Sequence, residues 1–157
     1  MIRAFLAVEL SEDLRGRIAS MQQEFKSSLL RELPRAVRLS WVRPASIHLT
    51  IKFLGDMDEQ LVEPLRDALA ETCKDQRVMS IPLERVGGFP SVRVPRVLWV
   101  GASESWEQGI EAKRLAALQQ SVETCCVALG FASNVRDRKS TRLNSSHVAL
   151  SRMPSSA

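Results

Sequence analysis

His48 and Thr50 stand two residues apart in a stretch where polar and apolar side chains alternate. In a β-strand this spacing places both side chains on one face, about 6.5–7 Å apart. An imidazole can take up or release a proton near neutral pH, and a threonine hydroxyl can donate a hydrogen bond to a phosphoryl oxygen beside it. The pair therefore indicates one half of an acid/base site for a phosphate ester.

The His48-x-Thr50 pattern leaves other interpretations open, because it spans only three residues. His48 can also be a surface histidine on the polar face of a strand. Lys52 continues the same alternation, and we expect a solvated lysine there rather than a source of positive potential for a site. Hydrolysis of a cyclic phosphate requires a base, an acid and donors for the charged oxygens. One His-x-Thr strand supplies half of these groups, and a second facing strand would supply the rest without a metal.

The elements that position this pair follow from the spacing of apolar residues, since strands repeat every two residues and helices every three to four. A buried strand is predicted over residues 2–9, and further strands over residues 37–42, 46–54, 79–86 and 97–100, with a loop over residues 87–90. Helices are predicted from Ser11, as N-cap, to Pro34, over residues 60–74, and from Ser103 or Ser105 to Gly130. This order predicts an α+β protein with a largely antiparallel sheet, in which a strand–helix–strand unit occurs twice.

Composition and charge indicate a single globular domain without a membrane span or a metal site. The chain has 157 residues, of which 45% are hydrophobic and 25% charged. No apolar run approaches the ~18 residues of a membrane span, and we expect a cytoplasmic protein. Cys73, Cys125 and Cys126 form no Cys-x-x-Cys pair, so reduced structural thiols are expected. Residues 137–157 carry +3 of the net charge of +4, so residues 1–136 are not those of a bulk polyelectrolyte binder.

Several segments of residues 1–131 together resemble, in order and spacing, the bacterial RNA 2′,3′-cyclic phosphodiesterases. These proteins are also called 2′-5′ RNA ligases and belong to the two-histidine phosphoesterase superfamily. The segments are RAFLAV (3–8), WVRP (41–44), HLTIKFLG (48–55), GGFP (87–90) and PRVLWVG (95–101). The resemblance implies a two-lobed fold with pseudo-twofold antiparallel sheets flanked by helices. Each lobe would contribute a His-x-Thr strand to a central cleft, within a domain of residues 1–136.

The resemblance also implies a function. His48 would be one of two catalytic acid/base histidines, and Thr50 would bind the substrate phosphate. The implied reaction is hydrolysis of an RNA 2′,3′-cyclic phosphate to a 2′-phosphomonoester, with a weaker 2′-5′ ligation, and with no metal and no cofactor. The implied partner is an RNA or oligonucleotide with a cyclic phosphate end, and not a membrane. Two other classes remain: a non-catalytic RNA- or nucleotide-binding module, and an unrelated α+β domain with a surface histidine.

The second motif that the resemblance requires is His-x-Thr-x-x-Arg, a short distance after Gly130-Phe131. His147 begins a stretch that keeps the histidine and Arg152 but has Ala149 in the threonine position, so His147 is a doubtful second-motif residue. Residues 137–157 also resemble the translation of a common DNA sequencing adapter. We therefore expect a non-native, disordered tail over residues 137–157, a truncated domain whose second lobe is incomplete, and little activity in this chain.

Overall fold

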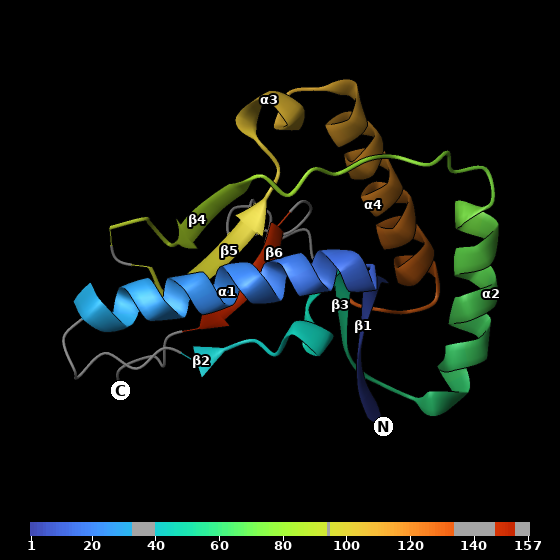
Figure 1. The fold of residues 1–157 in the computed structure, drawn as a ribbon. Helices are drawn as coiled ribbons and strands as arrows, with labels where there is room; N and C mark the ends of the chain where they lie inside the picture. The colour runs from blue at the N-terminus through green and yellow to red at the C-terminus, as the bar shows by residue number, and fades with distance from the viewer. Residues whose placement is uncertain (33–39, 94, 134–146, 153–157) are drawn as a thin grey trace.

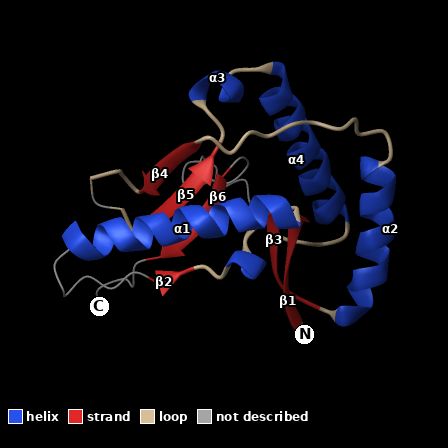
Figure 2. Ribbon diagram, in the orientation of Figure 1, coloured by secondary structure: helices blue, strands red, loops and turns tan. Residues whose placement is uncertain are grey.

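The computed structural model describes residues 1–32, 40–93, 95–133 and 147–152. Along the chain, a strand followed by a long helix and another strand occurs twice (Figure 1; Figure 2). The strands are β1 (Ile2–Glu9), β2 (Ser40–Trp41), β3 (His48–Met57), β4 (Arg85–Phe89), β5 (Val97–Gly101) and β6 (His147–Arg152). The helices are α1 (Glu12–Glu32), α2 (Val62–Cys73), α3 (Glu104–Glu107) and α4 (Ile110–Ala128), with the 3-10 turns η1 (Pro44–Ser46) and η2 (Glu59–Leu61).

The strands form two antiparallel sheets, which confirms the predicted α+β class. β1 pairs with β3, and the other four described strands pair in the order β2-β6-β5-β4. The first unit of the repeat is β1-α1-β3, and the second is β5-α3-α4-β6; in each unit the two strands pair with one another. β3 and β6 approach each other where the units meet, so the strands that carry His48 and His147 adjoin.

Each long helix packs mainly against the sheet of the other unit. In one core cluster, Ile18 of α1 packs with Val100 of β5 and Leu150 of β6. In the other, Val122 of α4 packs with Met57 of β3, and side chains from α2 and β1 join them. Figure 1 shows the same exchange, with α1 lying across β5 and β6 while α4 and α2 flank β1 and β3. Leu49 of β3 also belongs to the cluster around Ile18, so the core around each long helix includes side chains of the other unit.

The helix ends agree with the residues at them, with one break that the sequence did not reveal. The Leu14 N–H donates to the Ser11 hydroxyl (3.3 Å), as predicted for an N-cap. The third predicted helix is two helices, because the chain takes an extended conformation at Gly109 between α3 and α4. After α4, Gly130 has a φ of +89°, a conformation that glycine adopts most easily and that ends the helix.

The strand predicted over residues 79–86 begins instead at Arg85 and runs through the glycines to Phe89. The sequence predicts a loop at Gly87-Gly88, yet Gly87 pairs with Trp99 of β5. A Cβ on Gly87 would overlap the Trp99 ring, so the glycine allows the indole to lie over β4. The strand predicted over residues 2–9 is correct in its bounds but not fully buried, since Phe5 is 46% exposed.

β6 is the main departure from the expected fold, because residues 137–157 were expected to lack regular structure. Residues 147–152 form this strand between β5 and β2, where the second sheet was expected to lack its motif strand. Leu150 falls between the residues paired with β5 and is fully buried. Its carbonyl accepts hydrogen bonds from the Val42 N–H (3.0 Å) and the Gln22 side-chain amide (3.0 Å). The buried Gln22 thus joins α1 to β6.

Candidate active site

His48 and Thr50 lie on the face of β3 that the core does not cover. His48 pairs with Glu9 and Thr50 with Ala7 across the β1–β3 ladder, and paired residues share a face of the sheet. Both side chains are half-buried, while Glu9 and Ala7 are exposed. Leu49, between them, is buried in the core. The alternation that the sequence shows at these positions is therefore the alternation of the strand.

The His48 ring is oriented by the backbone just before β3. Its Nδ1 lies 2.8 Å from the carbonyl oxygen of Ser46, the last residue of η1. A carbonyl can only accept, so Nδ1 carries the hydrogen and donates it. In the neutral ring Nε2 then holds the free electron pair, which is the state of a general base. Pro44 begins η1 and so helps to place the Ser46 carbonyl beside Nδ1 of the ring.

Phe5 from the neighbouring strand stacks on His48. The ring centroids are 4.7 Å apart and the ring planes differ by 23°. Phe53 lies on the same face, with its ring centroid 6.2 Å from that of Phe5. Sequence reasoning assigned Phe5 to a buried strand and did not place it beside His48. The available signal was its position in a second alternating strand, but the register that brings the two rings together is not visible in the sequence.

Lys52 does not lie on the face of His48, and it is not solvated, so both expectations for this residue are wrong. Ile51 has no partner in the β1–β3 register, and this bulge turns Lys52 to the core side of the strand. The Lys52 side chain is 3% exposed, and its Nζ lies 2.6 Å from Glu123 Oε2 on α4. Nζ also donates to the Ala132 carbonyl (3.1 Å). Lys52 therefore joins β3 to α4 instead of adding charge to the site.

Cys126 lies in the core close to this ion pair. The side chain is fully buried. Burial raises the pKa of the Cys126 thiol, and the nearby Lys52 ammonium partly opposes that shift. Such a thiol stays protonated at neutral pH and is a packing group.

The stretch that begins at His147 forms β6, which lies next to β3, but its residues differ from those of a His-x-Thr motif. His147 pairs with Gly101, and Ala149 pairs with Trp99, in the β5–β6 ladder. On the opposite edge of β5, Gly101 also pairs with Arg85 of β4. Arg85, Gly101 and His147 therefore form one row across the three strands. The side chains of His147 and Ala149 lie outside the described part of the structure. The sequence has Ala149 at the position where a second His-x-Thr motif would have its threonine.

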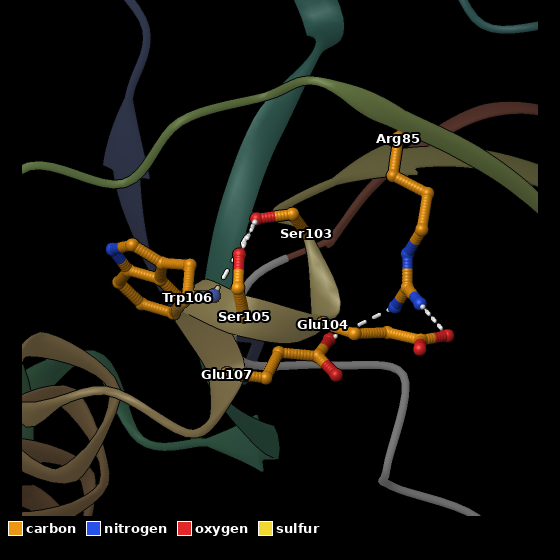
Figure 3. A network of polar contacts seen from close by, with 6 residues as sticks. All are labelled: Arg85, Ser103, Glu104, Ser105, Trp106 and Glu107. Carbon is orange, nitrogen blue, oxygen red and sulfur yellow. Dashed lines mark hydrogen bonds and ion pairs between the residues drawn. The ribbon is translucent and has the colours of Figure 1, made fainter.

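Arg85 is held by two carboxylates of α3, as Figure 3 shows. Its guanidinium nitrogens lie 2.8 Å from Glu104 and 3.1 Å from Glu107, and its guanidinium carbon is 5.3 Å from the centroid of the Trp99 ring. The Ser103 hydroxyl accepts the Trp106 N–H and so caps the short helix that carries both carboxylates. The two glutamates of α3 thereby compensate the positive charge of Arg85.

Within residues 1–32, 40–93, 95–133 and 147–152, no group of three or more His, Cys, Asp or Glu side chains could hold a metal ion. No helix in this described part combines the length and the apolar character that a bilayer crossing requires.

Two strand–helix–strand units with a His-x-Thr strand at their junction define the two-histidine phosphoesterase class. The LigT-like phosphoesterase family model matches residues 8–99, more than half of the chain. This chain therefore belongs to the LigT-like phosphoesterase family, which confirms the resemblance drawn from the sequence.

Curated relatives of the chain are named RNA 2′,3′-cyclic phosphodiesterase. The one from Methanothermobacter thermautotrophicus is 29% identical over 130 residues, which cover 83% of this chain and 63% of that protein. The one from Aquifex aeolicus is 32% identical over 105 residues, 66% of this chain and 51% of that protein. The chain thus spans between about half and two thirds of the length of these relatives.

Solved structures share the fold. A protein from Thermus thermophilus has a TM-score of 0.63 and 24% identity, over 99% of this chain and 76% of its own. Escherichia coli LigT in its apo form has a TM-score of 0.63 and 21% identity, over 99% of this chain and 74% of its own. At these identities the likeness concerns the fold alone.

Proposed function

We propose that the His48 strand is one half of an active site that hydrolyses RNA 2′,3′-cyclic phosphate ends to 2′-phosphomonoesters. The observation that supports this proposal most directly is that His48 and Thr50 lie together on the open face of β3. Nδ1 of His48 donates a hydrogen bond to the Ser46 carbonyl. Family membership and the names of the curated relatives support the same substrate class. RNA or an oligonucleotide with a cyclic phosphate end is the proposed partner.

The proposed chemistry uses the atoms that this strand exposes. His48 can act in either of two roles. As the base, its Nε2 takes a proton from the attacking water; as the acid, the protonated ring gives a proton to the departing ribose oxygen. The Thr50 hydroxyl donates to a phosphoryl oxygen and so stabilises the charge that develops there. The same displacement with the 5′-hydroxyl of a second RNA end in place of water would give 2′-5′ ligation, with the 3′ oxygen of the cyclic phosphate as the leaving group.

A complete site of this kind needs a second acid/base group on the opposite side of the phosphorus. We propose that β6 completes the site poorly in this chain, because Ala149 has no hydroxyl to donate to a phosphoryl oxygen beside His147. Residual turnover would then depend mainly on His48. We further propose that residues 137–157 do not derive from the gene of the family domain, which the adapter-like sequence supports. The DNA of the source organism beyond codon 136 tests this origin, and a gene encoding the present residues 137–157 would contradict it.

The direct test is hydrolysis of a short oligoribonucleotide ending in a 2′,3′-cyclic phosphate, with the 2′-phosphate product measured by chromatography. The Methanothermobacter relative serves as the reference enzyme in the same assay. We expect this chain to turn over the substrate far more slowly than the reference, with the same rate in EDTA. Turnover equal to that of the reference would contradict the proposed weakness of β6, and a rate lost in EDTA would contradict the histidine-only mechanism.

The second candidate function is nucleotide binding without catalysis, which the single complete His-x-Thr strand favours. Calorimetric titration with 2′-AMP separates the two functions. Binding together with product formation supports the enzyme, whereas tight binding with no product in a prolonged assay supports the binding module.

A further inference from the structure

Phe5 occupies an unusual place for a large apolar side chain. It is 46% exposed on the open face of the two-stranded sheet and belongs to neither core cluster of the described residues. Its ring lies face to face with the imidazole of His48, with centroids 4.7 Å apart and planes 23° from parallel. The side chain therefore lies against the rings of His48 and Phe53 on the open face rather than in the core.

The Ser46 hydrogen bond alone does not fix the imidazole. The second side-chain torsion of histidine is broad, so a ring held at Nδ1 can still swing about that contact and move Nε2 sideways. A ring stacked against one face blocks this swing, because aromatic pairs favour offset parallel or edge-on arrangements. Phe5 and Ser46 constrain two different motions of the same ring, and together they leave Nε2 with one direction.

We propose that Phe5 is a positioning residue that braces the His48 imidazole, so that Nε2 keeps the orientation needed for proton transfer. This role rests on the function proposed above, since it concerns the group that moves the proton. Phe5 acts through His48 and not through contact with the reacting phosphate. The proposal requires the aromatic ring of Phe5, because an aliphatic side chain has no flat face to stack on the His48 imidazole.

The test compares three variants on strand β1. Phe5→Leu keeps an apolar side chain but removes the ring, and Phe5→Tyr keeps the ring. Val8→Ala is the matched control, since Val8 is 49% exposed on the same strand but turned to the opposite face, where it pairs with Leu49. Circular dichroism and thermal melting of each variant establish that the fold is retained.

The first measurement needs no substrate. Long-range proton–nitrogen NMR correlations in mildly alkaline buffer distinguish a ring protonated at Nδ1 from one protonated at Nε2. The chain has two histidines, so a His147→Ala background leaves His48 as the sole signal. We expect a single Nδ1-protonated form in the parent chain, Phe5→Tyr and Val8→Ala, and averaging with the other form in Phe5→Leu. An unchanged His48 spectrum in Phe5→Leu overturns the proposal.

The second measurement divides the kinetic effect on the cyclic phosphate substrate. We expect Phe5→Leu to lower kcat roughly three- to tenfold with little change in KM, and Phe5→Tyr to restore it. A raised KM with unchanged kcat would mean that Phe5 binds substrate, and it overturns the positioning role. If the parent chain shows no turnover, the proposed function fails, and the NMR comparison still decides whether Phe5 braces His48.

Discussion

The two strand–helix–strand units share a topology but differ in their chemistry. In the first unit, β3 presents His48 and Thr50 on an open face, with the imidazole held by Ser46. In the second unit, the equivalent strand β6 begins at His147 but has Ala149 in the place of the threonine. The fold therefore needs only buried apolar residues in each motif strand, such as Leu49 in β3 and Leu150 in β6, whereas catalysis needs polar residues at the motif positions.

The largest expected effect comes from removing the histidine of the first unit. His48→Ala should lower turnover of the cyclic phosphate by about 10²–10⁴-fold, as loss of an acid/base group typically does. The same change at His147 should lower it by less than about threefold, because its motif lacks the hydroxyl. Equal losses at the two histidines, measured in one assay, would show that the units already act as a pair.

The ion pair between the units should dominate stability. Lys52→Met leaves Glu123 without its ammonium partner in a largely buried place, and breaking such a pair costs about 3–5 kcal/mol. Urea unfolding followed by circular dichroism measures the change in the free energy of unfolding. Lys74→Met is the control, since the Lys74–Glu71 pair is exposed and its loss should cost under about 0.5 kcal/mol. Similar effects in both variants would argue against a structural role for the Lys52 pair.

Completing the second motif tests whether the difference between the units is the missing hydroxyl. Ala149→Thr should raise turnover by about 10–100-fold, the range of a hydrogen bond to a charged oxygen. Ala149→Val has the same branched shape without the hydroxyl and should give no gain. His147→Ala in the Ala149→Thr background should abolish the gain. If the valine variant were equally active, packing of β6 and not hydrogen bonding would explain the effect.

The smallest expected effect concerns the start of a long helix: α1 has a side-chain cap at Ser11, whereas α4, with Gly109 as its N-cap, has none. Ser11→Ala should lower the free energy of unfolding by about 1 kcal/mol, and Ser11→Gly by only a few tenths. Thermal melting of the two variants side by side resolves the difference. A loss as large in the glycine variant would point to an effect of Ser11 other than capping.

Local patterns predicted the elements well but not the way they meet. The apolar spacing located α1, α2 and the strands β1, β3 and β5, and the His48–Thr50 alternation placed both side chains on one face. The prediction for Lys52 was wrong because the bulge at Ile51 depends on pairing with β1, which no local pattern records. The bounds of β4 were predicted wrongly for a similar reason. Gly87 leaves room for the Trp99 ring of another strand, a contact that no local pattern records.

β6 was missed because six residues among serines carry too weak a pattern to predict a strand. Its place depends on partners far along the chain: β5, β2 and the Gln22 amide. The Phe5–His48 stack is likewise a product of register. Sequence therefore located half of the candidate site, and the tertiary pairing added the residue that holds it.

The exchange of helices between the units has a consequence during synthesis on the ribosome. The apolar stripe of α1, which includes Ile18, packs against Leu49 of β3 and also against β5 and β6, which emerge many residues later. Until then the part of this stripe that β5 and β6 cover stays exposed to water and to other nascent chains, a condition that favours aggregation. Because many contacts of α1 join distant parts of the chain, the first unit completes its core only after most of the polypeptide has been synthesised.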